Sequence, residues 1–227
     1  MVPFILSGGC NDLLHLALKG NKVNGDLDVS YCKNLQFLDV SSNNFSVSIP
    51  SFGDCSALEH LDISSNKFNG DIALAIGNCA KLNFLNVSAN QFSGPVPMLP
   101  TGNLQYAYLA GNHFHGEIPL YLLDACTGLV QLDLSLNNLS APVPSRFAAC
   151  TSLESLAISG NKFTGKLPID TILKMSSLKY LDFSFNFFIG GLPDSLSKLT
   201  SLESLDLNSN NISGPIPTGL CKDPSNN

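Results

Sequence analysis

The fold is decided by residues 153–168, LESLAISGNKFTGKLP. Leu156 and Ile158 alternate with small or polar residues, and this period of two is typical of a short strand with one buried face. Asn161 then provides a turn residue, and Phe163 adds a further apolar position two residues later. A glycine that permits a tight turn and a proline that cannot donate a ladder hydrogen bond close the stretch. The stretch therefore predicts a strand, a turn, a second apolar anchor and a stop.

Variants of this stretch occur nine times along the chain. Aligned on the asparagine, the copies are 22 to 25 residues apart and share the frame L-x-x-L-x-L-x-x-N-x-F-x-G-x-[IVL]-P. The frame resembles the leucine-rich repeat, in the variety with a G-x-I-P extension found mainly in plant proteins. A buried asparagine amide must bond backbone groups of its own and the adjacent coil, so we expect an internal ladder. Its members are Asn21, Asn43, Asn66, Asn90, Asn112, Asn137, Asn161, Asn186 and Asn210.

No coil of such a repeat can bury its inner face alone, so neighbouring coils must cover it. We therefore predict one α/β domain over residues 1–227, a leucine-rich-repeat solenoid that is curved and superhelically twisted. Its parallel sheet should lie on the concave face, with short helical turns opposite and a mainly phenylalanine spine between them. We expect about nine repeats, no inserted island, no kinase domain and no transmembrane segment. Because neither end shows a polar cap, we also expect a stretch of a longer array.

Charge and motifs exclude several classes of function. The net charge of −6 and the pI near 5.0 disfavour nucleic acid and anionic lipid as partners. The sequence has no phosphate loop, no G-x-G-x-x-G, no H-E-x-x-H and no G-x-S-x-G. His113 and His115 have no identifiable third metal ligand and are expected to be exposed on a turn. We therefore expect no enzyme activity, no cofactor and no metal site.

Six of the seven cysteines occupy one position of the repeat, three residues before its first leucine. Copies without a cysteine carry Thr101, Met175 or Leu199 there, so cysteine serves as a small apolar residue. We expect buried free thiols at one equivalent site rather than disulfides or a metal site. The column consists of Cys10, Cys32, Cys55, Cys79, Cys126 and Cys150. Cys221 lies outside it and could pair with a residue beyond this chain.

Two solvent-facing rows of the predicted sheet are candidates for an interaction surface. One row carries aspartates that could hold a basic partner or simply keep the sheet soluble: Asp39, Asp62, Asp133, Asp182 and Asp206. Aromatic residues are enriched at interfaces, and they gather on the other row and beside it, either as a ligand surface or as packing. The candidates are Phe37, His60, Phe84, Tyr106, Tyr108 and Tyr180.

Four N-x-[ST] sequons are candidates for glycosylation. Three of them, at Asn44, Asn138 and Asn211, directly follow a ladder asparagine, where a glycan could project outward from a turn. Asn86 lies on the sheet face instead, so a glycan there would cover part of the expected binding surface. These sequons favour a secreted protein.

The sequences of the repeats, beyond their shared frame, resemble one family in particular. The runs SGGCNDLLHLALKGNKVNGDLDVSYCKNLQFLDVSSNNFS, GDCSALEHLDISSNKFNGD, DTILKMSSLKYLDFSFN and GLCKDPSNN are similar to the extracellular domain of plant brassinosteroid receptor kinases. The cysteine column, an "LKMSSL" helix and the "CKDPSNN" ending are the specific features. Two copies depart from the pattern, because those ending near Leu27 and Ile72 lack the terminal proline.

The resemblance implies a place and a role for the chain. Members of the family are single-pass plasma-membrane proteins with a secreted solenoid, an island that binds the steroid hormone, and a cytoplasmic kinase. The chain would be a repeat section of such an ectodomain, an architectural and protein-interaction scaffold on the extracellular side of the plasma membrane. Its partners would be neighbouring repeats and proteins or peptides on the concave face. Steroid and co-receptor would be reached only through parts of the parent not present here.

Two alternatives come from other classes. A free-standing secreted recognition module of the polygalacturonase-inhibitor type would use the concave face against pathogen enzymes. An intracellular scaffold would suit reduced cysteines but would leave the four sequons without a purpose.

Overall fold

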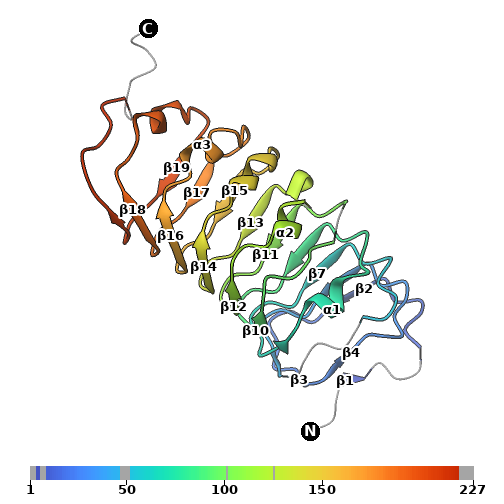
Figure 1. Ribbon diagram of the computed structural model, residues 1–227. Coiled ribbons are helices and arrows are strands. Elements are labelled where there is room, and N and C mark those ends of the chain that lie inside the picture. The colour runs from blue at the N-terminus through green and yellow to red at the C-terminus, as the bar shows by residue number, and fades with distance from the viewer. Residues whose placement is uncertain (1–3, 6–8, 47–51, 101, 125, 220–227) are drawn as a thin grey trace.

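The computed structural model describes residues 4–5, 9–46, 52–100, 102–124 and 126–219. The chain forms an elongated stack of coils, with the first coil at one end and the last at the other (Figure 1). Each coil contributes one short strand to a long sheet, and the helical turns lie on the opposite side of the stack. The predicted leucine-rich-repeat solenoid with a long parallel sheet is therefore confirmed.

The long sheet contains nine strands, all parallel and in register. The residue before each central apolar residue pairs with its equivalent in the next coil, as His15 does with Phe37 and Phe37 with His60. Equivalent residues therefore form straight columns across the sheet. The strands are β2 (His15–Ala17), β5 (Phe37–Asp39), β7 (His60–Asp62), β9 (Phe84–Asn86), β11 (Tyr106–Tyr108), β13 (Gln131–Asp133), β15 (Ser155–Ala157), β17 (Tyr180–Asp182) and β19 (Ser204–Asp206).

A second parallel sheet, absent from the sequence-based prediction, follows the ladder asparagines. The N-x-F-x-G segments do not simply turn; they pair from coil to coil, with a glycine at φ 85–94° at the fifth position in most copies. Ala141 takes that position in the sixth copy and also has a positive φ, of 77°. The strands are β8 (Asn69–Gly70), β10 (Gln91–Gly94), β12 (His113–Gly116), β14 (Asn138–Pro142), β16 (Lys162–Lys166), β18 (Phe187–Gly190) and β20 (Asn211–Ile212).

Two pairs of short strands lie in the first coils and complete the sheet structure. They are β1 (Phe4–Ile5) with β4 (Leu27–Asp28), and β3 (Asn24–Gly25) with β6 (Asn44–Phe45).

The helical turns are short and irregular. The predicted "LKMSSL" helix is wrong, because α3 ends at Ile172 and residues 173–178 form turns that lead into the next strand. Among the described residues, no helix is long and apolar enough to cross a membrane. The helices are α1 (Ala73–Ile76), α2 (Leu120–Asp124) and α3 (Ile169–Ile172), and the 3-10 turns are η1 (Cys126–Gly128), η2 (Ser145–Ala149) and η3 (Asp194–Lys198).

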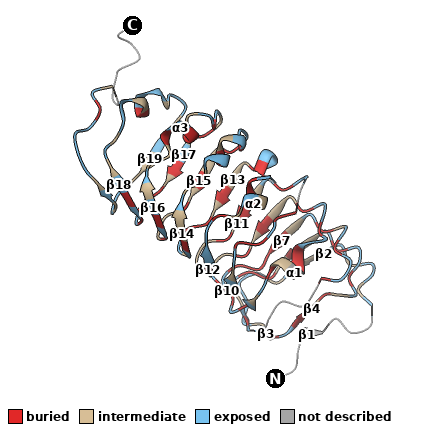
Figure 2. Cartoon of the chain, in the orientation of Figure 1, coloured by how far each residue is buried: buried red, intermediate tan, exposed pale blue. Residues whose placement is uncertain are grey.

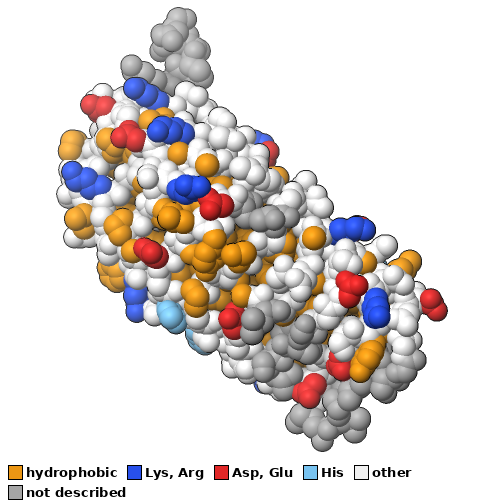
Figure 3. All heavy atoms as spheres, turned by 45° about the vertical axis from the view of Figure 1, so that its right-hand side comes forward, with side chains coloured by type: hydrophobic (Ala, Val, Ile, Leu, Met, Phe, Trp, Pro, Cys, Tyr) orange, Lys and Arg blue, Asp and Glu red, His pale blue; other side chains and the backbone are white. Residues whose placement is uncertain are grey.

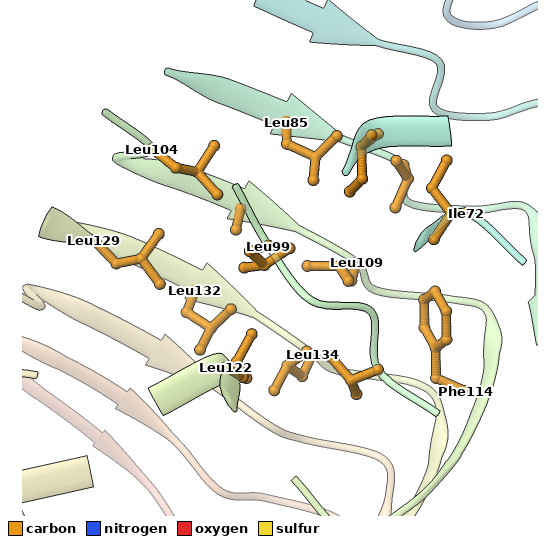
Figure 4. Close-up of a cluster of buried hydrophobic side chains, with 14 of the residues drawn as sticks. Ile72, Leu85, Leu99, Leu104, Leu109, Phe114, Leu122, Leu129, Leu132 and Leu134 are labelled. Carbon is orange, nitrogen blue, oxygen red and sulfur yellow. The ribbon is translucent and has the colours of Figure 1, made fainter. Parts of the chain in front are cut away.

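The core is one continuous column of apolar side chains between the sheets and the helical turns. Burial alternates along the strands, as the period of two predicts (Figure 2). Leucines from successive coils contact one another, and Phe114 lies at the turn end of this cluster (Figure 4). The spine residues of the central coils are fully buried, and Phe45 stacks on Phe68 with ring centroids 5.6 Å apart. Each coil thus buries its apolar face against its two neighbours.

The asparagine amides connect every coil from the second to the ninth with the coil before it. Asn112 is typical: its Oδ1 accepts from the backbone N–H of Phe92, 3.1 Å away, in the preceding coil. Its Nδ2 donates to the carbonyl of Val87 in that coil and to that of Leu109 in its own, both at 3.1 Å. Asn21 differs, because its Nδ2 donates to the carbonyls of Leu18 and Lys19 in its own coil.

The cysteine column contains disulfides, so the expectation of free thiols is wrong. The bonds are Cys10–Cys32, Cys55–Cys79 and Cys126–Cys150, which join copies 1 and 2, 3 and 4, and 6 and 7. Equivalence in the repeat places these residues with their Cα atoms 4.7–5.2 Å apart, within the range for a disulfide. The shared position therefore favours pairing between adjacent coils. Cys221 lies outside the described residues.

Replacing Asn112 with Ala should lower the free energy of unfolding by about 1–3 kcal/mol, because Phe92 N–H would stay buried without a partner. The carbonyls of Val87 and Leu109 would each lose one of their two amide donors. Asn21→Ala is the matched control and should change it by no more than about 0.5 kcal/mol, since this amide is exposed. The measurement is the denaturant midpoint of both variants. Equal effects would contradict a structural role for the amide between coils.

Replacing Cys126 and Cys150 together with Ala should cost about 2–4 kcal/mol of stability, because the unfolded chain loses a cross-link over 24 residues. Met175→Leu, at the same repeat position in a coil without a cysteine, should cost less than about 1.5 kcal/mol. Mass measurement after alkylation should find the six column cysteines unmodified until a reductant is added. Their alkylation in denaturant alone would restore the free-thiol interpretation.

Candidate functional site

The outer face of the nine-stranded sheet, here called the long-sheet face, carries a stack of aromatic rings over its first four strands. His15, Phe37, His60 and Phe84 lie ring on ring, with centroids 4.1, 4.2 and 4.3 Å apart and interplanar angles of 4–12°. The parallel register causes this arrangement, because equivalent residues of adjacent strands are about 4.8 Å apart. The register therefore brings aromatic residues at one position of successive coils within stacking distance.

Beyond Phe84 the stack changes direction. The Phe84 ring is 6.2 Å from that of Tyr106 and 5.6 Å from that of Tyr108, and both tyrosines are tilted by more than 40°. The Tyr108 hydroxyl donates to Oε1 of Gln131 in the next coil. Burial of this hydroxyl raises the pKa of Tyr108. The five candidates from Phe37 to Tyr108 thus form one continuous surface.

Tyr180 is separate from that surface. Two coils lie between it and Tyr106, with Gln131 and Ser155 at the intervening positions. Its hydroxyl donates to the carboxylate of Glu203, 2.7 Å away, and this bond raises the pKa of Tyr180. The aromatic candidates therefore form one cluster, from Phe37 to Tyr108, and Tyr180 is isolated from it.

His60 is the titratable side chain at an interior position of the ring stack, between Phe37 and Phe84. Burial between Phe37 and Phe84 lowers the pKa of His60, and the carboxylates of Asp62 and Asp39 offset part of that effect. The neutral imidazole is thus favoured where it lies between two apolar rings.

The aspartate row has a structural role that sequence analysis missed. Each aspartate accepts at Oδ1 from the backbone N–H two residues on, and Asp62 also accepts there from the Ser64 hydroxyl at 2.6 Å. These are Asx turns that end the strands. Most of the aspartates are followed two residues later by serine, as in DVS and DIS, and this signal could have predicted the turns. The row is therefore a set of turn caps, with one carboxylate oxygen engaged in each.

The four sequon asparagines have two kinds of surroundings. Asn44, Asn138 and Asn211 are exposed at the first positions of β6, β14 and β20, on the outer face of the second strand layer. Asn86 is half-buried on the long-sheet face. Its Oδ1 accepts from the Ser88 hydroxyl at 2.6 Å, and its Nδ2 donates to Asp62 Oδ2 at 3.3 Å.

The remaining expectations concern metals and cavities. His113 and His115 are exposed on β12, and the described part of the chain holds no group of three His, Cys, Asp or Glu side chains suited to a metal ion. A hollow of about 380 Å³ lies at the N-terminal ends of β7, β9 and β11, lined by polar residues and glycines. Charged side chains of both signs are interspersed over the face drawn in Figure 3. The lining of the hollow is Glu59, Lys81, Asn83, Gly102, Asn103, Gln105 and Gly128.

Comparison with known proteins agrees with the leucine-rich-repeat fold. A family model described as leucine rich repeat matches residues 151–212, and one described as leucine rich repeats in two copies matches residues 33–75. The structure is similar to that of the Arabidopsis receptor kinase HAESA in complex with the peptide hormone IDA and the co-receptor SERK1. The TM-score is 0.80 at 31% identity, over 89% of this chain and 34% of that one. The chain belongs to the leucine-rich-repeat proteins, and its coils are similar to those of a plant receptor ectodomain.

Two relatives identify more specifically the family of receptors to which the chain is homologous. The chain is 58% identical over 149 residues to Protein BRASSINOSTEROID INSENSITIVE 1 of Arabidopsis thaliana, over 66% of this chain and 12% of that protein. It is 53% identical over 154 residues to the Brassinosteroid LRR receptor kinase of Solanum lycopersicum, over 68% of this chain and 13% of that protein. The chain is thus homologous to ectodomain repeats of the brassinosteroid receptor kinases, and the matches span about an eighth of their length. These relatives do not favour the free-standing recognition module.

The lowered pKa of His60 predicts a pH dependence of stability. The unfolded chain takes up this proton more readily than the folded chain, so stability should fall as the pH drops below about 6.5 and level off below the lowered folded value. His60→Gln should reduce that loss between pH 7.5 and 5 in denaturant titrations. His113→Gln, which removes an exposed histidine, should keep the wild-type dependence. An unchanged slope in His60→Gln would contradict the assignment.

Proposed function

We propose that the chain is a repeat section of the ectodomain of a brassinosteroid-type receptor kinase, on the extracellular side of the plasma membrane. The high identity to two brassinosteroid receptor proteins supports the family of the parent. Three disulfides support an oxidising compartment, since they persist outside the cytosol. The same bonds argue against the intracellular scaffold considered above. The parent would carry its serine/threonine kinase elsewhere, and this section is not an enzyme.

The section acts as an architectural scaffold. The observation that carries this role is the asparagine ladder from Asn43 to Asn210. Successive ladder asparagines are never more than 25 residues apart, which leaves no room for an inserted island. A steroid requires a mostly apolar pocket. The 380 Å³ hollow is lined by polar side chains and suits such a ligand poorly. The section therefore extends the array and sets the geometry in which hormone and co-receptor meet other parts of the receptor.

The long-sheet face is the proposed contact surface for a protein or peptide. HAESA, a structural relative, was crystallised with a peptide hormone and a co-receptor, which supports protein or peptide partners in general. Phe37, His60, Phe84, Tyr106 and Tyr108 would form one contact area here, and Tyr180 a second. Because the rings from His15 to Phe84 cover each other's faces, a partner would contact the edges of these rings. Neighbouring repeats of the parent are the other proposed partners.

A glycan on Asn86 would change this surface. Asn86 is on β9, two residues after Phe84, on the same face of the sheet. A sugar on its Nδ2 would stand over the end of the ring stack. A glycan at Asn86 and a close-fitting partner at Phe84 are therefore mutually exclusive.

The proposed function is tested by titrating a brassinosteroid into two proteins by calorimetry. The chain alone should give no saturable heat with a dissociation constant below about 1 µM. The full ectodomain that contains this section should bind the steroid and is the positive control. Submicromolar binding to the chain alone would overturn the scaffold role. Failure of the full ectodomain to bind would overturn the assignment to a brassinosteroid-type parent.

A further inference from the structure

Two apolar side chains stand exposed side by side on the second sheet. Phe187 and Ile189 are 58% and 48% exposed, and they alternate along β18 with the buried Phe188. We call these two residues the β18 patch. On the other strands of this sheet the equivalent outward positions carry polar residues, among them Thr164 and Ser93. An exposed apolar pair at this place is therefore a local exception that indicates contact with something.

The patch is bounded on one side by the chain itself. β16 pairs with β18 so that Thr164 lies beside Phe187 and Lys166 beside Ile189. The stem of Lys166 runs along β18, because its Cγ would be 3.5 Å from a Cβ placed on Gly190. The methylenes of a lysine commonly cover apolar surface in this way. The open side of the patch is therefore the side that faces β20.

A glycosylation sequon occupies that open side. Asn211, followed by Ile212 and Ser213, pairs with Ile189 in the parallel register of β18 and β20. Paired residues of adjacent parallel strands point to the same face about 4.8 Å apart, so the Asn211 side chain emerges directly beside Ile189. Asn211 is exposed, and its amide makes no side-chain hydrogen bond within the part of the chain that the structure describes. A sugar attached to Nδ2 would begin at the edge of the patch.

We infer that Asn211 carries an N-linked glycan whose first sugar packs on Phe187 and Ile189. A pyranose ring has one face of C–H groups, and N-acetylglucosamine adds a methyl group. These apolar surfaces match an aromatic ring and an aliphatic side chain one strand away. A protein partner for the same patch would have to share its space with the glycan. The inference rests on the extracellular location proposed above.

The experiment uses chains secreted from a eukaryotic host and keeps one sequon at a time. Asn44→Gln, Asn86→Gln and Asn138→Gln together leave Asn211 as the only sequon. Fluorescence of an apolar dye is measured on the intact glycoform, after trimming to the first sugar, and after complete enzymatic removal. Trimming should leave the fluorescence unchanged, and complete removal should raise it. The rise should disappear when Phe187→Ser and Ile189→Thr are added.

A matched control keeps Asn138 as the only sequon. Asn138 lies at the equivalent ladder-plus-one position on β14, but its paired neighbour is the polar His115. Removal of a glycan from Asn138 should leave dye fluorescence unchanged. Because the enzyme converts the asparagine to aspartate in both proteins, the added charge cancels from the comparison. A rise of equal size in the control would overturn the packing of sugar on the patch.

Mass measurement of the four sequons separates the two proposals. Glycans at Asn44 and Asn138 with none at Asn211 would overturn the β18 patch inference and leave the extracellular assignment intact. No glycan at any site would count against the extracellular assignment as well. A glycan at Asn211 whose removal leaves the dye signal unchanged would show the patch to be open to a protein partner, and would overturn the inference.

Discussion

The structure depends on one constraint: no coil by itself can bury its apolar face or complete the hydrogen bonds of its asparagine amide. The amide oxygen of Asn66 accepts from Phe45 N–H in the preceding coil, and its nitrogen donates to Val40 O in that coil. Loss of a neighbour would therefore expose apolar surface and leave buried backbone groups unpaired at the same time. Hydrogen bonding and burial thus favour the same stack, and three disulfides hold adjacent copies in it.

Much of this arrangement follows from the sequence because the repeat fixes it locally. The L-x-L alternation predicts the nine strands, and the spacing of the asparagines predicts their register. The second sheet could not be predicted in the same way, because its register is offset from the repeat: Thr164 pairs with Phe187, whereas its equivalent in the next copy is Ile189. The disulfides were missed for a related reason. A repeat position shared by Cys55 and Cys79 is also typical of small packed side chains, although adjacent coils bring that position within bonding distance.

Backbone strain also escapes sequence-based prediction here. The residue before the ladder asparagine has a positive φ in every described copy, and glycine fills this position only at Gly20, Gly111 and Gly160. Leu136 and Phe185 adopt it at 53° and 51° with their side chains exposed, a conformation that bulky residues seldom take. The neighbouring asparagine and strand bonds hold the backbone in this shape. Local propensity is overridden because the stack determines where the chain must turn.

The fixed coil spacing also determines what each surface presents. A column of side chains about 4.8 Å apart is a chain of forced contacts, so the chemistry of one position depends on its neighbours. Rings at His15, Phe37 and His60 cover one another, whereas Phe187 has threonine beside it and stays exposed. The aspartate row shows the same principle with charge. Like charges on adjacent strands repel, and an asparagine amide at position 86 replaces that repulsion with a donor to Asp62. Each residue in such a column therefore contacts its equivalents in the two neighbouring coils. The properties of one surface position thus depend on the residues at that position in both neighbours.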